Sequence, residues 1–492
     1  MLNTITVIIN QIVVVICGFI VPRMILLTYG SEVNGLVSSI TQFLTVITFM
    51  DMGIGVVVQA SLYKPLANGD HVEVSKIISS ADRFLKKIAL GILIYVIILV
   101  FAYPRIVNQS FGDIYTGTLI LAMCISYFAQ YFFGLKNQLL VIADQKGYIA
   151  YALNSLLLIA NNAVSVILIL HGASIQFVKL VASLILVAKP FILEAYVRKN
   201  YRIDRKVKYT EEPIKQKWNG IAQHIATVIL TSTDTIVLSL LSTLENVSIY
   251  YVYHLVVNGL DNLVIAFTSG FLSLFGNMIS KNEDDLLKKS FNAFESMFHL
   301  IVTYIFGCVL VLIVPFVQVY TKGVTDVNYA LPTFAALITI ANLFYCYRLP
   351  YNTLVKAAGH FRQTQNSAII EAALNIIISV ILVFKYGLVG VAIGTLVAMA
   401  YKTVYLVLYL RHNIIKRGVM TFVKHMIADA ICLGAIYILG SSIVFTDLTY
   451  MSWIVLAIKW AVINLAICCL INVIFFRNDI ISGYRYLRRK TH

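Results

Sequence analysis

The chain has 492 residues, of which 60% are hydrophobic and only 12% are charged, and its mean hydropathy is +0.85. Soluble domains carry roughly 25% charged residues, so this composition excludes a soluble fold and indicates a protein that lies in lipid. The net charge of +15 does not indicate a nucleic-acid partner, because the basic residues follow the pattern of a membrane protein facing an anionic leaflet.

Long apolar runs dominate the chain from end to end. Inside hydrocarbon every backbone group must be hydrogen-bonded within its own segment, so runs of about 20 apolar residues must be helices. We therefore predict an all-α polytopic membrane protein with about 14 transmembrane helices. The predicted spans are 4–28, 35–60, 84–104, 115–135, 148–170, 174–197, 219–241, 248–272, 291–318, 329–350, 363–384, 388–410, 422–446 and 452–476.

The distribution of Lys and Arg predicts how these spans are oriented. With the N-terminus in the cytoplasm, 30 of the 38 basic residues lie at cytoplasmic ends, eight of them between Arg198 and Lys217. This asymmetry follows the positive-inside rule and places both termini in the cytoplasm. Because Met1-Leu2-Asn3-Thr4 has no basic n-region, no cleavable signal peptide is expected.

The first half of the chain recurs in the second half at a nearly constant offset. Glu32 recurs as Glu245 and Asn68 as Asn282, while Asn154-Ser155 recurs as Asn366-Ser367 and the run 165–168 as 379–382. Each copy holds six predicted spans, an even number, so both copies enter the membrane in the same orientation. We predict an N-terminal six-helix lobe at 1–200, a C-terminal six-helix lobe at 201–412, and two additional helices with a basic cytoplasmic tail at 413–492.

No catalytic residue, metal ligand or cofactor is predicted. The predicted outer loops are too short to carry paired carboxylates, and no glycine-rich loop that would bind ATP phosphates is present. The cysteines lie in or at the ends of apolar spans without ligand spacing, which is typical of small core residues. They are Cys17, Cys124, Cys308, Cys346, Cys432, Cys468 and Cys469.

Charged residues within the spans are the main candidates for function, because charge is costly in a bilayer. The basic ones are Arg23, Lys179, Lys189, Lys402 and Lys459. Arg23 follows Pro22 and Lys189 precedes Pro190, where a kink frees backbone carbonyls. We predict Arg23, Lys179, Lys189 and Lys459 as cavity cations that bind substrate, and we expect Lys402 to snorkel to the headgroups. The alternative for each is snorkelling or an ion pair with a neighbouring span.

Polar residues also recur at helical spacing and predict a polar path for a coupling ion. The stripes are His224, Thr227, Thr231 and Asp234 in the seventh span, His254, Asn258 and Asp261 in the eighth, and Ser367, Glu371 and Asn375 in the eleventh. The competing interpretation is that these residues form hydrogen bonds that hold the bundle together.

Four segments resemble the polysaccharide flippases of the MATE-like MOP exporter superfamily (the Wzx type). They are the runs 49–55, 233–239, 357–362 and 386–394, which in this chain read FMDMGIG, TDTIVLS, AAGHFR and YGLVGVAIG. The two additional spans are similar to those of the lipid II flippases and of some capsule exporters, whereas many O-antigen flippases have twelve spans.

The resemblance implies a transporter that moves an undecaprenyl-diphosphate-linked oligosaccharide from the cytoplasmic to the outer leaflet of the bacterial inner membrane. Its product would serve O-antigen, capsule or exopolysaccharide biosynthesis beside a glycan polymerase and glycosyltransferases, with membrane lipids as further partners and no nucleic acid. The family's cavity is lined by basic residues, and Arg23 matches the position after the first-span proline.

Three alternatives stay open at the level of the sequence. A cation-coupled multidrug exporter of the related MATE family would keep the fold, but its site should be acidic and aromatic. A membrane-embedded glycan polymerase or ligase would need a large outer loop. A structural subunit of a glycan-assembly complex would leave the charges within the spans unexplained.

Overall fold

The computed structural model describes residues 2–46, 49–107, 110–204, 207, 209, 212–214, 232–441, 443 and 445–490. Within these ranges the regular structure is entirely helical, and no strand occurs. Eleven of the described helices are long and apolar enough to cross a membrane. The prediction of an all-α protein with multiple membrane spans is therefore confirmed.

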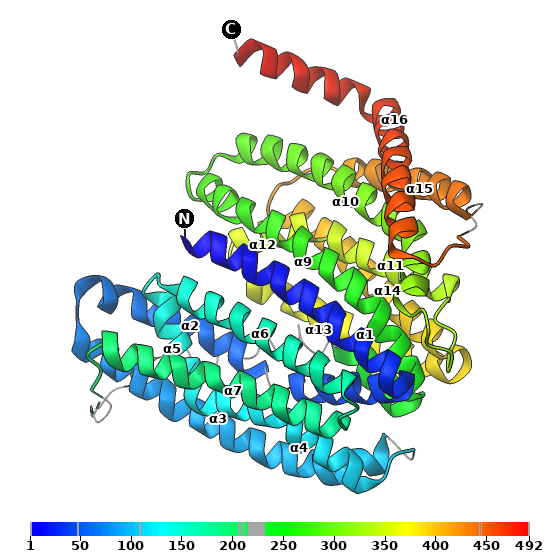
Figure 1. The fold of residues 1–492 in the computed structure, drawn as a ribbon. Helices are drawn as coiled ribbons and strands as arrows, with labels where there is room; N and C mark the ends of the chain where they lie inside the picture. Colours follow the sequence, from blue (N-terminus) through cyan, green and yellow to red (C-terminus); the bar gives the residue numbers. More distant parts are fainter. Residues whose placement is uncertain are drawn as a thin grey trace. The chain divides into compact units, whose positions relative to one another are not determined.

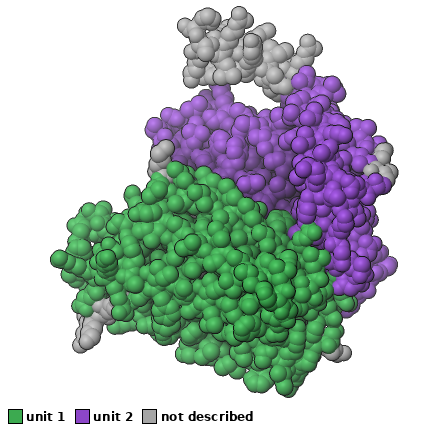
Figure 2. Space-filling model, in the orientation of Figure 1, with its two compact units in different colours: residues 1–248 green, residues 249–492 purple. Residues whose placement is uncertain are grey.

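The chain forms two compact units, Met1–Ser248 and Ile249–His492, which Figure 2 distinguishes by colour. In the first unit α1 packs on α6, α6 on α7, and α4 on both α3 and α7 (Figure 1). Its helices are α1 (Leu2–Thr45), α2 (Phe49–Asn68), α3 (His71–Ile106), α4 (Asp113–Ala129), the π-helical turn η2 (Gln130–Gly134), α5 (Leu135–Ala143), α6 (Gly147–Leu170) and α7 (Ile175–Asn200). A short helix, Ser232–Leu241, and the start of α9 (Leu244–Ser280) complete it.

Capping residues set where two of these helices begin. Asp70 precedes α3 and its side-chain Oδ1 accepts a hydrogen bond from the backbone N–H of Glu73 at 2.9 Å. Gly69, with φ +69°, makes the preceding turn in a conformation that other residues rarely adopt. Ser174 caps α7 in the same way through the N–H of Phe177. Each cap satisfies a backbone donor that the first turn of a helix leaves unpaired.

The helix α7 lies unusually close to η2. A β-carbon added at Gly134 would lie 2.8 Å from the Cβ of Pro190, so this contact requires glycine. The wider π-helical turn at 130–134 interrupts the span predicted at 115–135 and joins α4 to α5. Such single π-turns often mark functional positions in helices, and this one lies beside Lys189.

Two predicted span boundaries differ from the structure. The loop predicted at Gly30–Asn34 is a sharp turn at Gly30 (φ 84°, ψ 176°), where two helical segments of α1 (Leu2–Thr45) meet, and residues 31–34 are already helical. The tenth predicted span, 329–350, corresponds to α11 (Pro332–Tyr347), and a second helix, α12 (Leu349–Ala357), follows it after Arg348 and extends beyond the predicted end. Most of the seventh predicted span, residues 219–231, lies outside the described part of the chain.

The second unit is built around α10 (Asp284–Tyr320), which packs against α11, α15 and α16, while α14 packs on α11 and α13. Its further helices are α13 (Phe361–Tyr386), α14 (Leu388–Asn413), α15 (Met420–Ser441) and α16 (Tyr450–Lys490). Aromatic rings fill its core, with Phe271 stacked on Phe294 at 4.0 Å and Phe298 fully buried. Large apolar side chains such as Phe384 and Val462 remain 72% and 66% exposed, as expected for surfaces covered by lipid.

Two cysteines meet where α15 packs on α16. The buried Sγ atoms of Cys432 and Cys468 lie 3.3 Å apart, although no pairing is evident from their spacing in the sequence. Side-chain rotation can shorten this contact to the roughly 2.05 Å of a disulfide.

We expect oxidation by iodine to join Cys432 and Cys468 in a disulfide. The two thiols lose their protons, and iodine accepts the two electrons. A protease site inserted after Asp447 would then leave both fragments linked until the disulfide is reduced. The Cys468→Ser variant should give separate fragments, whereas Cys469→Ser, at the exposed neighbouring position, should still crosslink. Separate fragments in the native chain would contradict this packing of α15 on α16.

Candidate functional site: buried polar clusters in the membrane helices

In the first unit a chain of hydrogen bonds connects three helices. Lys189 Nζ on α7 donates to Asn154 Oδ1 on α6 at 3.0 Å. Asn154 Nδ2 in turn donates to Asn10 Oδ1 on α1 at 2.9 Å, and Ser155 Oγ donates to the same oxygen at 3.2 Å. Amide side chains are costly in lipid unless they are bonded, so this cluster fixes the three helices relative to one another. It also places an ammonium group among polar atoms beside Pro190.

The other predicted cations occupy different environments. Arg23 is half-buried on α1 beside Pro22, and Lys179 is half-buried in the first turns of α7. Lys459 is exposed on α16, among apolar residues that face away from the unit's core. These residues are therefore not gathered into one cluster within either unit by the described contacts.

The predicted polar stripes are only partly described. His224, Thr227 and Thr231 lie outside the described residues. Asp234, in the helix Ser232–Leu241, is 4% exposed, and Asp261, on α9, is 7% exposed. His254 stacks on Tyr250 with ring centroids 5.4 Å apart, whereas Asn258 is exposed. The three polar residues predicted on one face of the eighth span thus do not lie in one common environment.

The second unit contains a buried cluster at the break between α11 and α12. Arg348, at this break, forms an ion pair with Glu371 on α13, and the thiol of Cys346 lies 3.4 Å from Asp261 Oδ1. On α14, Lys402 Nζ donates to Ser367 Oγ at 2.6 Å. On the same two helices, Asn375 Nδ2 donates to Thr395 Oγ1 at 3.1 Å. All three residues of the predicted stripe in the eleventh span, Ser367, Glu371 and Asn375, therefore have partners here.

One expectation from the sequence is wrong in this cluster. Lys402 does not snorkel to the headgroups, because packing of α14 on α13 leaves it 8% exposed and bonded to Ser367. Arg348, which the sequence did not single out, is buried as well. The helix breaks at this residue, which turns its guanidinium inward to Glu371 and over the Tyr345 ring at 4.5 Å.

A second buried network in this unit was not predicted. Glu295 on α10 pairs with Arg417, from the connection between α14 and α15, and accepts a hydrogen bond from Tyr351. One turn along α10, His299 Nδ1 lies 2.6 Å from Asp429 Oδ2 on α15. These partners are 122 and 130 residues apart in the chain. One pattern in the sequence could have revealed this network. Glu295, His299 and Thr303 are spaced four residues apart, which puts them on one face of α10.

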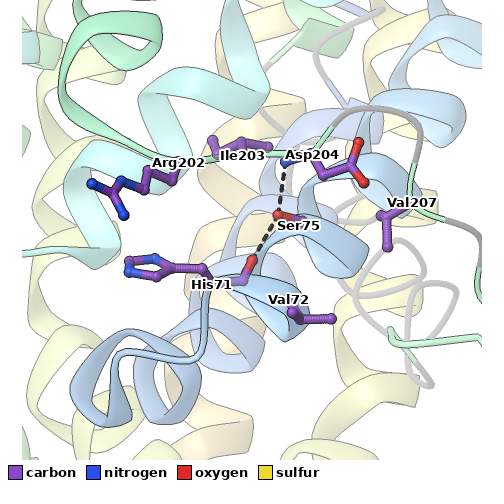
Figure 3. A pocket seen from close by; sticks show the side chains of 7 residues that line it. All are labelled: His71, Val72, Ser75, Arg202, Ile203, Asp204 and Val207. Atoms are coloured by element: carbon purple, nitrogen blue, oxygen red, sulfur yellow. Dashed lines mark hydrogen bonds between the residues drawn. The ribbon is translucent and has the colours of Figure 1, made fainter.

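A pocket of about 380 Å³ lies in the first unit, outside the apolar spans. It is formed where residues 202–204 and Val207 lie against the start of α3, with His71 and Arg202 on one side and Asp204 on the other (Figure 3). Ser75 Oγ holds the two segments together, since it accepts from Asp204 N at 3.0 Å and donates to the His71 carbonyl at 2.6 Å.

Polar contacts fix the chain that leaves α7. The Tyr201 hydroxyl donates to Asp144 Oδ2 at 2.6 Å, and Lys146 pairs with the same oxygen at 2.7 Å. Burial and this carboxylate raise the pKa of Tyr201, and the hydrogen bond to Asp144 raises the pKa of Lys146.

Among the described residues, no group of three or more His, Cys, Asp or Glu side chains is placed to hold a metal ion.

Neither a protein-family model nor any curated protein matches the sequence. Solved structures do match the fold. A lipid II flippase, MurJ, in an inward closed conformation matches with a TM-score of 0.73, at 17% identity over 97% of this chain and 99% of that chain. An inward-facing multidrug resistance MATE family transporter of the MOP superfamily matches with a TM-score of 0.66, at 12% identity over 80% of this chain and 93% of that chain.

The MATE transporter VcmN of Vibrio cholerae, in a bent form, matches with a TM-score of 0.52, at 12% identity over 87% of this chain and 95% of that chain. The chain has the fold of these membrane transporters. The resemblance to the MOP superfamily is thereby supported at the level of the fold. These likenesses extend over most of the chain, so they concern the whole architecture and not one helix hairpin.

Proposed function

We propose that this protein is a flippase that carries an undecaprenyl-diphosphate-linked oligosaccharide from the cytoplasmic to the outer leaflet of the bacterial inner membrane by alternating access. The observation that carries the proposal is the match to a lipid II flippase over 97% of this chain. The match to the MATE transporter covers 80%. A role in O-antigen, capsule or exopolysaccharide biosynthesis, beside a polymerase and glycosyltransferases, follows from the same proposal.

We also propose that residues 1–200 and 201–412 form two lobes that derive from one six-helix repeat, and that the last two of fourteen membrane helices are added after them. Helix bounds support this: α7 runs Ile175–Asn200 and α14 runs Leu388–Asn413, so the two helices are equally long and both ends show the same offset along the chain. The turns before α3 and α10 agree as well. Gly69 and Asn282, which are separated by that same offset, both have positive φ, of 69° and 56°.

Basic residues in the apolar helices support an anionic cargo. We propose that Arg23, Lys179, Lys189 and Lys459 contact the diphosphate, whose desolvation charge-assisted hydrogen bonds would offset. With the cell interior negative, outward movement of an anion gains about 2.3 kcal/mol per charge per 100 mV, so the membrane potential can drive the cycle. Coupling to an ion through His224, Thr231, Asp234, His254, Asn258, Asp261 or Glu371 stays a prediction.

The second candidate function is export of cationic drugs coupled to an ion, which the likeness to MATE transporters favours. Such a site needs acidic side chains that are available to a cation. Glu371 and Glu295, however, are each paired with an arginine inside the second unit. The ammonium groups of Lys189, which is half-buried, and of Lys402, which is buried, add positive charge, which favours the anionic cargo.

The test is transport of a fluorescent undecaprenyl-diphosphate oligosaccharide by the purified protein in liposomes. We expect Arg23→Ala to slow transport about tenfold or more, because a hydrogen bond to a charged group contributes about 1.5–3 kcal/mol. Arg23→Lys should restore transport in part, since it keeps the charge and loses the planar fork of donors. Arg198→Ala, whose side chain is 68% exposed, should transport like the native protein.

Efflux of a cationic dye without transport of the lipid would contradict the proposed function and favour the drug exporter. Normal lipid transport by Arg23→Ala would leave the function in place and remove Arg23 from the site.

A further inference from the structure

Each unit contains a lysine that is held by a polar residue of the preceding helix. In the first unit Lys189 on α7 donates to Asn154 on α6 at 3.0 Å. In the second unit Lys402 on α14 donates to Ser367 on α13 at 2.6 Å. In both cases the bond joins two consecutive helices that pack closely along their length.

The two pairs occupy equivalent places in the chain. The offset from Lys189 to Lys402 is identical to the offset from Asn154 to Ser367. The helices that hold the lysines, α7 and α14, begin and end at this same offset. The lysines therefore keep their register. Their partners' helices, α6 and α13, begin one residue further apart, at Gly147 and Phe361, and the bonded partner is an amide in one unit and a hydroxyl in the other.

The surroundings of Lys402 favour the binding of an anion by its ammonium group. It is 8% exposed, and its ammonium group has three donors, of which Ser367 takes one. No carboxylate of the described residues lies within 4.0 Å of its Nζ, because Arg348 pairs with the nearby Glu371. The Tyr405 ring, 5.8 Å away, offers partial compensation. The one carboxylate that acts on Lys402, Glu371, is thus shared between Lys402 and Arg348. A buried cation whose charge is only partly balanced is costly, and within membrane helices such a group marks a binding site.

We propose that Lys189 and Lys402 have equivalent functions in the two units, each providing an ammonium group that binds a phosphate oxygen of a phosphorylated lipid. Asn154 and Ser367 are positioning residues that hold these ammonium groups. The identity of the lipid as an undecaprenyl diphosphate rests on the proposed function, whereas the equivalence of the lysines rests on their geometry. Lys402 thereby joins the substrate-binding residues.

The experiment is binding of undecaprenyl diphosphate to the full-length protein in nanodiscs, followed by native mass spectrometry. We expect Lys189→Met and Lys402→Met each to weaken binding about tenfold or more, by similar factors, as for the loss of one charge-assisted hydrogen bond. The double variant should bind more weakly than either single variant. Lys385→Met, an exposed lysine at the end of α13, should bind like the native protein.

Two further variants separate binding from folding. Lys402→Gln keeps a donor without the charge and should lose binding, while Lys402→Arg keeps the charge and should retain most of it. Ser367→Ala should weaken binding less than Lys402→Met, because the ammonium group remains. Native-like binding by Lys402→Met or Lys402→Gln would overturn the proposal, as would a defect confined to Lys189→Met.

Comparison ligands separate this inference from the proposed function. Undecaprenol, which has no phosphate, should bind independently of both lysines. If phosphatidylglycerol or inorganic pyrophosphate bound as tightly as undecaprenyl diphosphate, and with the same dependence on both lysines, the equivalence would stand and the proposed cargo would be wrong. If undecaprenyl diphosphate bound specifically but without dependence on Lys402, the cargo would stand and the equivalence would be wrong.

Discussion

Replacing Arg417 with alanine is expected to lower the free energy of unfolding by about 3–5 kcal/mol, because it leaves a buried carboxylate without its partner. Arg417 donates to Glu295, which is 0% exposed, and to Asn292 Oδ1 at 2.6 Å. Its guanidinium also lies 4.9 Å from the Phe291 ring centroid. This one side chain attaches the connection between α14 and α15 to α10.

The measurement is thermal unfolding in detergent, monitored by tryptophan fluorescence, since Trp453 and Trp460 lie on α16 in the same unit. A fall in the melting temperature of the order of 10 °C is expected for Arg417→Ala. Arg411→Ala, at an exposed position of α14, should change it little. The double variant Glu295→Leu, Arg417→Met should be more stable than Arg417→Ala, because it removes both charges. Equal stability of Arg417→Ala and Arg411→Ala would show that the pair contributes nothing.

Adding one methyl group at Gly35 is expected to destabilise the first unit by about 1–3 kcal/mol, the usual cost of overpacking. A β-carbon at this position would lie 1.8 Å from the carbonyl oxygen of Leu244, which is backbone and cannot rotate away. The start of α9 would have to move from α1. That shift would also break the buried hydrogen bond from Asn34 Nδ2 to Ser248 Oγ, now 2.8 Å.

Gly91→Ala is the matched control for Gly35→Ala. Gly91 lies on an exposed face of α3 with no atom within 4 Å of an added β-carbon, so alanine there should stabilise the helix slightly. The yield of monodisperse protein after extraction and its melting temperature should fall for Gly35→Ala and stay level or rise for Gly91→Ala. Identical values for the two variants would contradict the close contact with Leu244.

From the sequence, the candidate site residues could be recognised only by their positions within a single helix. Lys189, beside Pro190, and Asp261, in an apolar span, were identified as candidates without any knowledge of their neighbours. Their partners could not be identified in this way, because Asn154 is 35 residues from Lys189 and Cys346 is 85 residues from Asp261. For Lys402 the isolated helix even favoured the wrong outcome, since a long side chain can extend toward the headgroups when nothing packs over it.

By itself, the sequence determined the all-helical class, the membrane as solvent and most of the spans, because in lipid each helix must satisfy its backbone hydrogen bonds between residues four apart. The tertiary structure decided the pairing of Glu295 with Arg417 across 122 residues. It also decided that Lys402 is buried. These features depend on how each helix is rotated against its neighbours, and that rotation is set by side-chain packing between segments far apart in the chain.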